Sequence, residues 1–247
     1  MDLRWLMREL GRDLLALVWP TACVCCGAPD RDCCLSCLVE LRRPGQLLRP
    51  AIGAECFVRG VYAGPLRALL VAFKHEGRTG LSRELGAELR SPLLAALERC
   101  VGPAPPVIVP APSRPSSIRR RGYRPVDRLL DEALRGARSP WGVHAGERIG
   151  CSRIAALRLR ALRTTWGRRG QVGLGPGDRA RNAARIAVRG AARAALRGRE
   201  VILVDDVITT GATVLAAREA LEAEGARVVA VAALCVAERR DTRGETG

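Results

Sequence analysis

The chain has 247 residues, and 48% of them are hydrophobic, which is enough for a folded core and argues against wholesale disorder. Lysine and arginine number 41 against 25 aspartate and glutamate, so the formal net charge is +16 and anionic partners such as nucleic acid or phosphorylated metabolites are expected. No run of 18 uninterrupted apolar residues occurs and charges interrupt the first twenty residues, so we expect no membrane insertion, no signal peptide and a cytoplasmic location.

The N-terminal segment, residues 1–43, is predicted to combine a helix with a cysteine-rich module. Leucines at near-helical spacing predict the helix over residues 1–19. Six of the ten cysteines follow in the sequence CVCCGAPDRDCCLSC, between Cys23 and Cys37. In a chain without an export signal, a cluster this tight favours a metal site over disulfides.

Two CxxC turns in this cluster can each offer two thiolates to one tetrahedral ion, and four thiolates leave no open coordination position for catalysis. We therefore expect a structural Zn²⁺ site. Its four expected ligands are Cys23, Cys26, Cys34 and Cys37. The other two cysteines of the cluster, Cys25 and Cys33, are spare and can replace a member of either pair. A set of reduced thiols or a redox site is the disfavoured alternative.

The rest of the chain is predicted to be a linker over residues 44–56, one α/β domain over residues 57–238 and a polar tail over residues 239–247. The expected strands cover 57–62, 107–109, 186–188, 201–204 and 228–235, and the expected helices cover 65–73, 81–97, 126–134 and 213–224. A basic loop is expected at 110–122, and further loops at 136–182 with a short helix near Leu157. The C-terminal succession of strand, loop, helix and strand is a βαβ unit, which predicts a parallel sheet flanked by helices.

The segment VILVDDVITTGAT, residues 201–213, carries most of the functional information. A buried strand is predicted to end at Asp205 and Asp206, and a short loop then enters a helix. Unpaired amides and the positive end of the helix dipole favour an anion there, and Gly211 allows a close backbone approach. Hydroxyl donors are added by Thr209, Thr210 and Thr213. Because two carboxylates repel a phosphate, they are expected to face sugar hydroxyls or Mg²⁺.

This segment resembles the phosphoribosyl pyrophosphate (PRPP) motif of type I phosphoribosyltransferases. Other segments narrow the resemblance to the ComF/GntX family of competence-associated proteins, in order over roughly residues 20–238. They are the paired CxxC turns, Phe73-Lys74 with Gly77, Pro110-Ala111-Pro112, Arg120-Arg121-Gly122-Tyr123, and Gln171 with Arg179 and Asn182. The family commonly continues Arg-Gly with Phe-Asn-Gln, whereas Tyr123, Arg124 and Pro125 stand here, so the contacts of those two amides are absent.

The resemblance implies a type I phosphoribosyltransferase-like fold with an N-terminal zinc module. Asp205 and Asp206 would be the catalytic pair, contacting the ribose hydroxyls of PRPP or a Mg²⁺ that they share. The residues that would wrap the 5′-phosphate are Thr209, Thr210, Gly211, Ala212 and Thr213. The segment 111–113 would lie near the pyrophosphate. The cations that would neutralise the pyrophosphate are Arg120, Arg121 and Lys74, the one lysine of the chain.

Two classes of function fit these residues. An enzyme would transfer ribosyl phosphate from PRPP to an acceptor that the sequence does not identify. A nucleic-acid-handling protein would serve DNA uptake, as the resemblance implies, with single-stranded DNA and a competence helicase as partners. A PRPP-sensing transcriptional regulator is a third, weaker alternative. The arginine-rich stretches 158–169 and 179–199 are candidates for a nucleic-acid track, but a composition high in Ala, Gly and Arg explains the charge about as well.

Overall fold

The structure is a computed structural model of the whole chain, and it describes residues 21–29, 31–43, 47–48, 53–135, 148–151, 154–165 and 185–237. The helix expected over residues 1–19, the tail 239–247 and the motif residues Gln171, Arg179 and Asn182 lie outside the described residues. Among the described helices, none combines the length and the apolar character needed to span a membrane.

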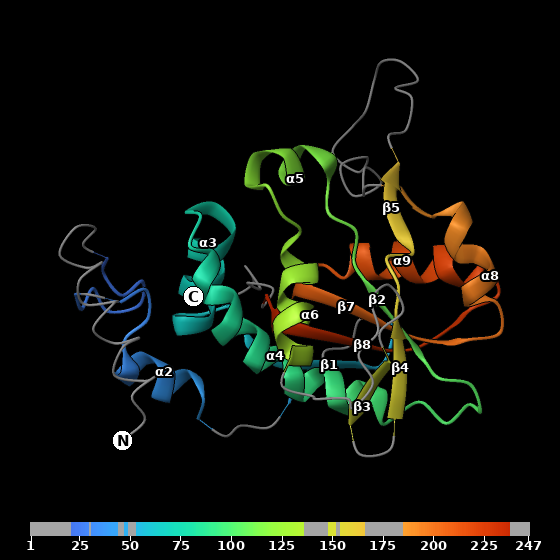
Figure 1. Cartoon of the computed structure of the whole chain (residues 1–247), viewed down its shortest axis with the longest axis horizontal. Coiled ribbons are helices and arrows are strands. Elements are labelled where there is room, and N and C mark those ends of the chain that lie inside the picture. The colour runs from blue at the N-terminus through green and yellow to red at the C-terminus, as the bar shows by residue number, and fades with distance from the viewer. Residues whose placement is uncertain are drawn as a thin grey trace, which may run out of the picture.

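A six-stranded sheet forms the centre of the molecule, with the strand order β1-β8-β7-β2-β4-β3 (Figure 1). The strands are β1 (Cys56–Val61), β2 (Val107–Pro110), β3 (Arg148–Cys151), β4 (Ile154–Arg158), β7 (Glu200–Ile208) and β8 (Arg227–Val236). The first five in spatial order are parallel to one another, and β3 pairs antiparallel with β4 at one edge. The predicted parallel sheet is therefore confirmed.

Helices cover both faces of this sheet, as the sequence predicts for a parallel sheet. One face carries α3 (Gly64–His75), α4 (Ser82–Leu97) and α6 (Pro125–Arg135), and the other carries α8 (Arg193–Leu196) and α9 (Ala212–Glu222). The shorter elements are α2 (Leu35–Leu41), α5 (Pro115–Arg121) and two 3₁₀ turns, η1 (Thr79–Leu81) and η2 (Gly190–Ala192).

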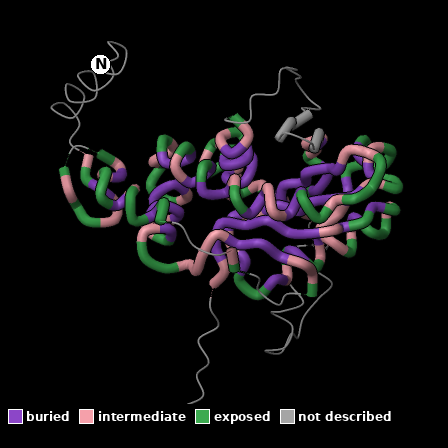
Figure 2. Tube along the Cα trace, turned by 90° about the horizontal axis from the view of Figure 1, so that it is seen from below, coloured by how far each residue is buried: buried purple, intermediate pink, exposed green. Residues whose placement is uncertain are grey.

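Strand β7 divides the core into two halves. Ile202 and Val204 pack with the α3, α4 and α6 side, whereas Val201 and Leu203 pack with the α9 side, and all four are fully buried. Figure 2 shows the strands as a buried band between more exposed helices and loops. A strand that buries both faces is continuously apolar, which is why this run of aliphatic residues is the clearest strand signal in the sequence.

The segment 136–182 differs from the prediction. Residues 154–158 form β4 and residues 162–165 form β5 (Leu162–Thr165), which pairs antiparallel with β6 (Arg185–Val188) in a separate two-stranded sheet. The short helix expected near Leu157 is wrong, because Leu157 pairs with Val107 of β2 and its N–H donates to the carbonyl of Pro106. This segment forms a strand because β2, which lies fifty residues earlier in the chain, offers it an edge with which to pair.

The basic stretch 110–122 also differs from the prediction, because it contains the helix α5 rather than loop throughout. Pro115 occupies the first turn of α5, and Gly122, with φ +78°, ends it. Proline at the start and a left-handed glycine at the end are ordinary helix boundaries. The helix holds three consecutive arginines in its last turn, and one of them, Arg121, contacts the last turn of α3.

The cysteine module packs on the large domain. Cys23, Cys33, Cys37 and Leu41 belong to the same buried cluster as the side chains of α3 and α4. Arg59 of β1 spans the junction, because its Nε donates to Glu88 Oε2 at 2.6 Å while its Nη2 donates to the carbonyls of Leu41 at 2.8 Å and Arg43 at 3.0 Å. The predicted domain boundaries around residues 44–56 stay a prediction.

Helices α4 and α6 cross closely at Gly86. A Cβ at this position would lie 2.4 Å from the Cβ of Glu132 and 2.8 Å from the carbonyl oxygen of Leu129. We expect Gly86→Ala to force the helices apart and to lower the free energy of unfolding by about 1–3 kcal/mol, the usual cost of overpacking. Denaturant unfolding measures this loss, and Gly190→Ala, where a Cβ meets no atom within 4 Å, is the control. Equal stability of Gly86→Ala and wild type would contradict the close crossing.

Candidate functional site

The carboxyl end of β7 leads through a tight turn into α9. The strand runs on to Ile208, so Asp205 and Asp206 lie within its last part rather than just beyond it. Gly211 then adopts φ +76° and precedes the first residue of α9, a backbone conformation that side chains rarely tolerate. The Ala212 N–H donates to Thr210 Oγ1 at 3.3 Å. The turn therefore presents hydroxyls beside the amide end of an eleven-residue helix.

An open pocket of about 240 Å³ lies at the carboxyl ends of β2 and β7, the place where parallel α/β sheets bind ligands. We call it the acidic-pair pocket. Its lining residues are Lys74, Ala111, Pro112, Ser113, Arg114, Ser117, Arg121, Pro125, Val126, Asp205, Asp206, Val207 and Thr213. It thus joins the end of α3, the segment after β2, helix α5, the end of β7 and the start of α9.

The two carboxylates of this pocket are in different electrostatic situations. Asp206 is buried, and its Oδ1 accepts a 2.6 Å hydrogen bond from Lys74 Nζ in an ion pair. Asp205 accepts only the backbone N–H of Asp206, at 2.8 Å on its Oδ1, among the hydrogen bonds of the described residues. Burial, together with the negative charge of Asp206, raises the pKa of Asp205 to about 7. Asp205 is therefore the carboxylate whose charge lacks a full counter-charge.

Arg121 and Tyr123 attach the end of α5 to the last turn of α3. Arg121 Nε donates to the carbonyl of Lys74 at 2.8 Å, and the Tyr123 hydroxyl donates to the carbonyl of Phe73. The ring of Tyr123 also packs on that of Phe73, with centroids 5.2 Å apart. Burial lowers the pKa of His75, and the nearby charges of Arg121, Arg120 and Lys74 lower it further. This rim of the pocket is therefore strongly positive.

The structure gathers only part of the predicted set at this pocket. Its lining includes Lys74, Arg121, Asp205, Asp206 and Thr213. The adjoining turn holds Thr209, Thr210, Gly211 and Ala212, whereas Arg120 is exposed and does not line the pocket.

The sequence interpretation missed the contribution of Arg114 and Ser117. Both reach the pocket from the start of α5. The Pro115 and Gly122 boundary signals of that helix were the available clue.

The cysteine cluster forms a second candidate site. The Sγ atoms of Cys23, Cys26, Cys34 and Cys37 all lie within 4.8 Å of one another. Zn–S bonds of about 2.3 Å in a tetrahedron require sulfurs about 3.8 Å apart, so this set fits a four-thiolate metal site. Burial alone would raise the pKa of Cys23, but the backbone N–H groups of Cys34, Cys26 and Cys25 outweigh it and lower that pKa to about 6.

The two spare cysteines also approach this cluster. Cys25 and Cys33 form a second set with Cys23, whose Sγ atoms again lie within 4.8 Å of one another. The four-cysteine set is complete without them, and it is the one that the paired CxxC spacing predicts.

Comparison with known proteins identifies related chains. The sequence profile of the phosphoribosyl transferase domain matches residues 169–246. The DNA utilization protein YhgH of Escherichia coli (strain K12) is 30% identical over 220 residues, which cover 87% of this chain and 84% of that protein. The protein of the same name from Shigella flexneri is 29% identical over 220 residues, with the same coverage.

The raised pKa of Asp205 predicts how its replacement acts on stability. An acid whose pKa rises from about 4 in the unfolded chain to about 7 in the folded one contributes stability at low pH that is lost as the pH rises through 7. Asp205→Asn cannot ionise, so the Tm of the variant minus that of wild type should increase from pH 6 to pH 8. Thermal unfolding without ligand or Mg²⁺ measures this difference, with Glu219→Gln at an exposed position of α9 as the control. A difference that stays constant with pH would refute the assignment.

Proposed function

Because this chain belongs to the ComF/GntX family of phosphoribosyltransferase-like proteins, we propose that it binds PRPP with Mg²⁺ at the acidic-pair pocket and acts in DNA uptake. The observation that carries the proposal is the meeting of two carboxylates, three cations and a phosphate-type turn at the carboxyl ends of β2 and β7. The parts of PRPP require that combination: a 5′-phosphate, a ribose diol and a pyrophosphate.

The pocket and the adjoining turn offer a complementary chemical group for each part of PRPP. The turn at residues 209–213 supplies hydroxyls and helix amides for the 5′-phosphate. Asp205 and Asp206 are acceptors for the ribose hydroxyls. Fixed cations near the segment 111–113, where the pyrophosphate would lie, are supplied by Lys74, Arg114 and Arg121. Because negative charge builds up as pyrophosphate departs, fixed cations on that side would favour transfer of the ribosyl phosphate.

The acidic pair also fits Mg²⁺, a hard cation that prefers oxygen ligands. Asp206 already pairs with Lys74, so Asp205 is the carboxylate with charge to offer. When bound there, Mg²⁺ would supply positive charge to the pyrophosphate oxygens. The chain's own contribution is to hold these two carboxylates in a largely buried place, where an added cation gains more than it would in water.

For the cysteine module we propose a structural Zn²⁺ on Cys23, Cys26, Cys34 and Cys37. The fit of the four sulfurs supports this set. Four thiolates leave no open coordination position for a substrate, which favours a structural role of the ion over a catalytic one. The ion would stabilise a segment that is too short to build a core of its own and that packs on α3.

The proposed role in DNA uptake has two supports. The related proteins carry the name of DNA utilization proteins, and the net charge of +16 favours a polyanionic partner such as single-stranded DNA. A competence helicase is the proposed protein partner. A DNA-binding protein without transferase activity, or a PRPP-sensing regulator, is the alternative, and the acidic pair and phosphate-type turn support PRPP binding in each case.

Calorimetry tests the PRPP proposal. Wild type should bind PRPP saturably and only with Mg²⁺, and Asp205→Asn/Asp206→Asn should lose at least tenfold in affinity because each carboxylate contact to the diol or the ion is charge-assisted. The exposed Glu219→Gln serves as the control that loses a carboxylate elsewhere. Absence of binding by folded, zinc-loaded wild type would sink the proposal and leave DNA handling as the function.

Metal analysis tests the zinc assignment and chooses between the cysteine sets. Cys26→Ser and Cys34→Ser should each lose bound zinc and lower the Tm, because three thiolates hold the ion less tightly than four. Cys25→Ser is the matched control from the same cluster and should keep one zinc per chain. Zinc retained by Cys26→Ser but lost by Cys25→Ser would move the site to the set Cys23, Cys25 and Cys33.

A further inference from the structure

A second pocket, of about 270 Å³, lies between α5 and the two-stranded sheet. We call it the arginine pocket. Its lining residues are Pro110, Ala111, Pro112, Ser113, Pro115, Ile118, Arg119, Arg124, Asp127, Arg160, Leu162, Arg163, Thr164 and Arg189. The segment 111–113 borders both this pocket and the acidic-pair pocket, so the two are neighbours. In Figure 1, α5 and β5 project in the same direction beyond the main sheet.

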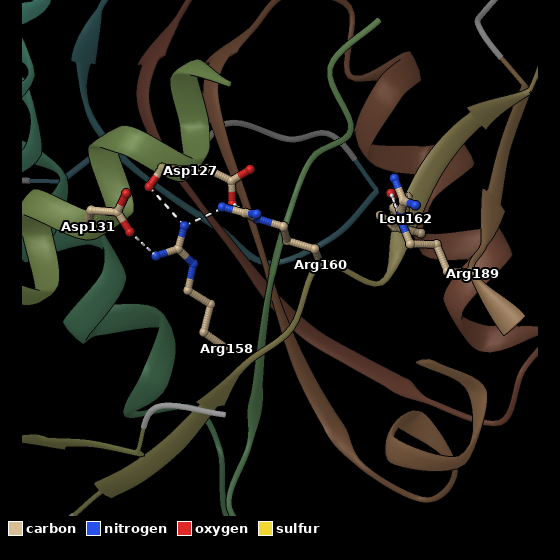
Figure 3. A network of polar contacts seen from close by, with 6 residues as sticks. All are labelled: Asp127, Asp131, Arg158, Arg160, Leu162 and Arg189. Atoms are coloured by element: carbon tan, nitrogen blue, oxygen red, sulfur yellow. Dashed lines mark hydrogen bonds and ion pairs between the residues drawn. The ribbon is translucent and has the colours of Figure 1, made fainter. Parts of the chain in front are cut away.

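Among the described residues that line the arginine pocket, the single acid is already neutralised. Asp127 is buried, and its Oδ1 accepts from Arg158 Nη2 at 2.8 Å and from Arg160 Nε at 2.9 Å (Figure 3). Arg158 also pairs with Asp131 at the edge of this network. Because two guanidinium groups share this carboxylate, the described lining residues leave no negative charge for the other arginines.

The remaining donors of the pocket have few partners. Within the described part of the chain, Arg119, Arg124 and Arg163 form no ion pair, and Arg189 Nε makes one long hydrogen bond, 3.3 Å, to the carbonyl of Leu162 (Figure 3). The Thr164 hydroxyl oxygen is buried and has no hydrogen-bond partner among the described residues. A buried polar atom left unpaired costs about 1–3 kcal/mol, so a ligand rich in acceptor oxygens would relieve both deficits.

The lining residues also indicate which chemical group of a ligand the pocket would recognise. None of the described residues that line the arginine pocket is aromatic, so it offers no platform on which a nucleobase stacks. Guanidinium groups match phosphate oxygens in geometry as well as in charge. A neutral base would leave the surplus positive charge of this pocket unanswered, whereas a phosphate group would neutralise it.

We propose that the arginine pocket binds a phosphate monoester, carried by a nucleotide or by the 5′ end of a single DNA strand, beside the acidic-pair pocket. The proposal goes beyond PRPP binding and does not depend on it, because none of the pocket's arginines is assigned to PRPP above. Arg124, just before α6, and Arg163 of strand β5 hold the phosphate, and Thr164 adds a hydroxyl.

The experiment compares matched ligands on the full, zinc-loaded chain. Calorimetry is run with thymidine 5′-monophosphate against thymidine, and with a 5′-phosphorylated thymidine oligonucleotide against its 5′-hydroxyl form. In each pair the phosphorylated member should bind at least tenfold more tightly. A phosphorylated oligonucleotide that binds more tightly than the mononucleotide identifies a strand end as the source, and equal affinities identify a free nucleotide.

Variants localise the binding to this pocket. Arg124→Gln/Arg163→Gln should weaken binding of the phosphorylated ligands about tenfold to a hundredfold, the usual worth of one or two charged hydrogen bonds, and should leave PRPP binding unchanged. Arg83→Gln, on an exposed part of α4, removes a charge elsewhere and should change affinity less than threefold.

Three outcomes overturn the proposal. Equal binding of phosphorylated and unphosphorylated ligands would mean that no phosphate is recognised. Equal weakening by Arg83→Gln would mean that net charge alone binds the ligand. Binding of inorganic pyrophosphate that depends on Arg124 and Arg163, without any nucleotide binding, would assign the pocket to the leaving group of PRPP instead.

Discussion

Two carboxylates at the end of a strand that is buried on both faces impose the main constraint on this molecule. Strand β7 brings Asp205 and Asp206 out of water, and like charges so close are costly in a region of low dielectric. The ion pair of Lys74 with Asp206 offsets part of that cost and holds the end of α3 against β7. Arg121 Nε in turn donates to the Lys74 carbonyl, so the end of α5 is held at the same residue.

Lys74 combines a contact inside the protein with the role that the sequence predicts for it. As the one lysine of an arginine-rich chain, it was expected to neutralise pyrophosphate directly. In the structure its ammonium group donates to Asp206 at 2.6 Å, so part of its positive charge is neutralised by a carboxylate of the protein itself. If an anionic ligand and a divalent cation bind together, the cation would pair with the two carboxylates and the anion with the lysine. Neither of the two added charges would then be buried without a partner.

The βαβ unit of β7, α9 and β8 could be predicted from the sequence because its signals are local: a continuous apolar run, a Thr-Thr-Gly turn and a helix followed by the left-handed Gly225. The paired CxxC turns are local in the same sense. Strand β4 could not be predicted, since its apolar spacing suits a helix or a strand and its partner Val107 lies fifty residues earlier in the chain. The arginine pocket could not be predicted either. Arg124, Arg163 and Arg189 are far apart in the sequence and meet only once β5 and β6 have formed. Arginine is also common throughout this sequence, so no single arginine stands out.

The close crossing at Gly86 has an evolutionary consequence. Helix α6 begins beside the arginine pocket and supplies Asp127, which orients two arginines, while its later residues rest on Gly86. A larger side chain at position 86 would shift α6 along with the carboxylate that it carries. Among related chains, position 86 is therefore expected to vary together with the facing positions 129, 132 and 133, and surface arginines are expected to drift independently of all four.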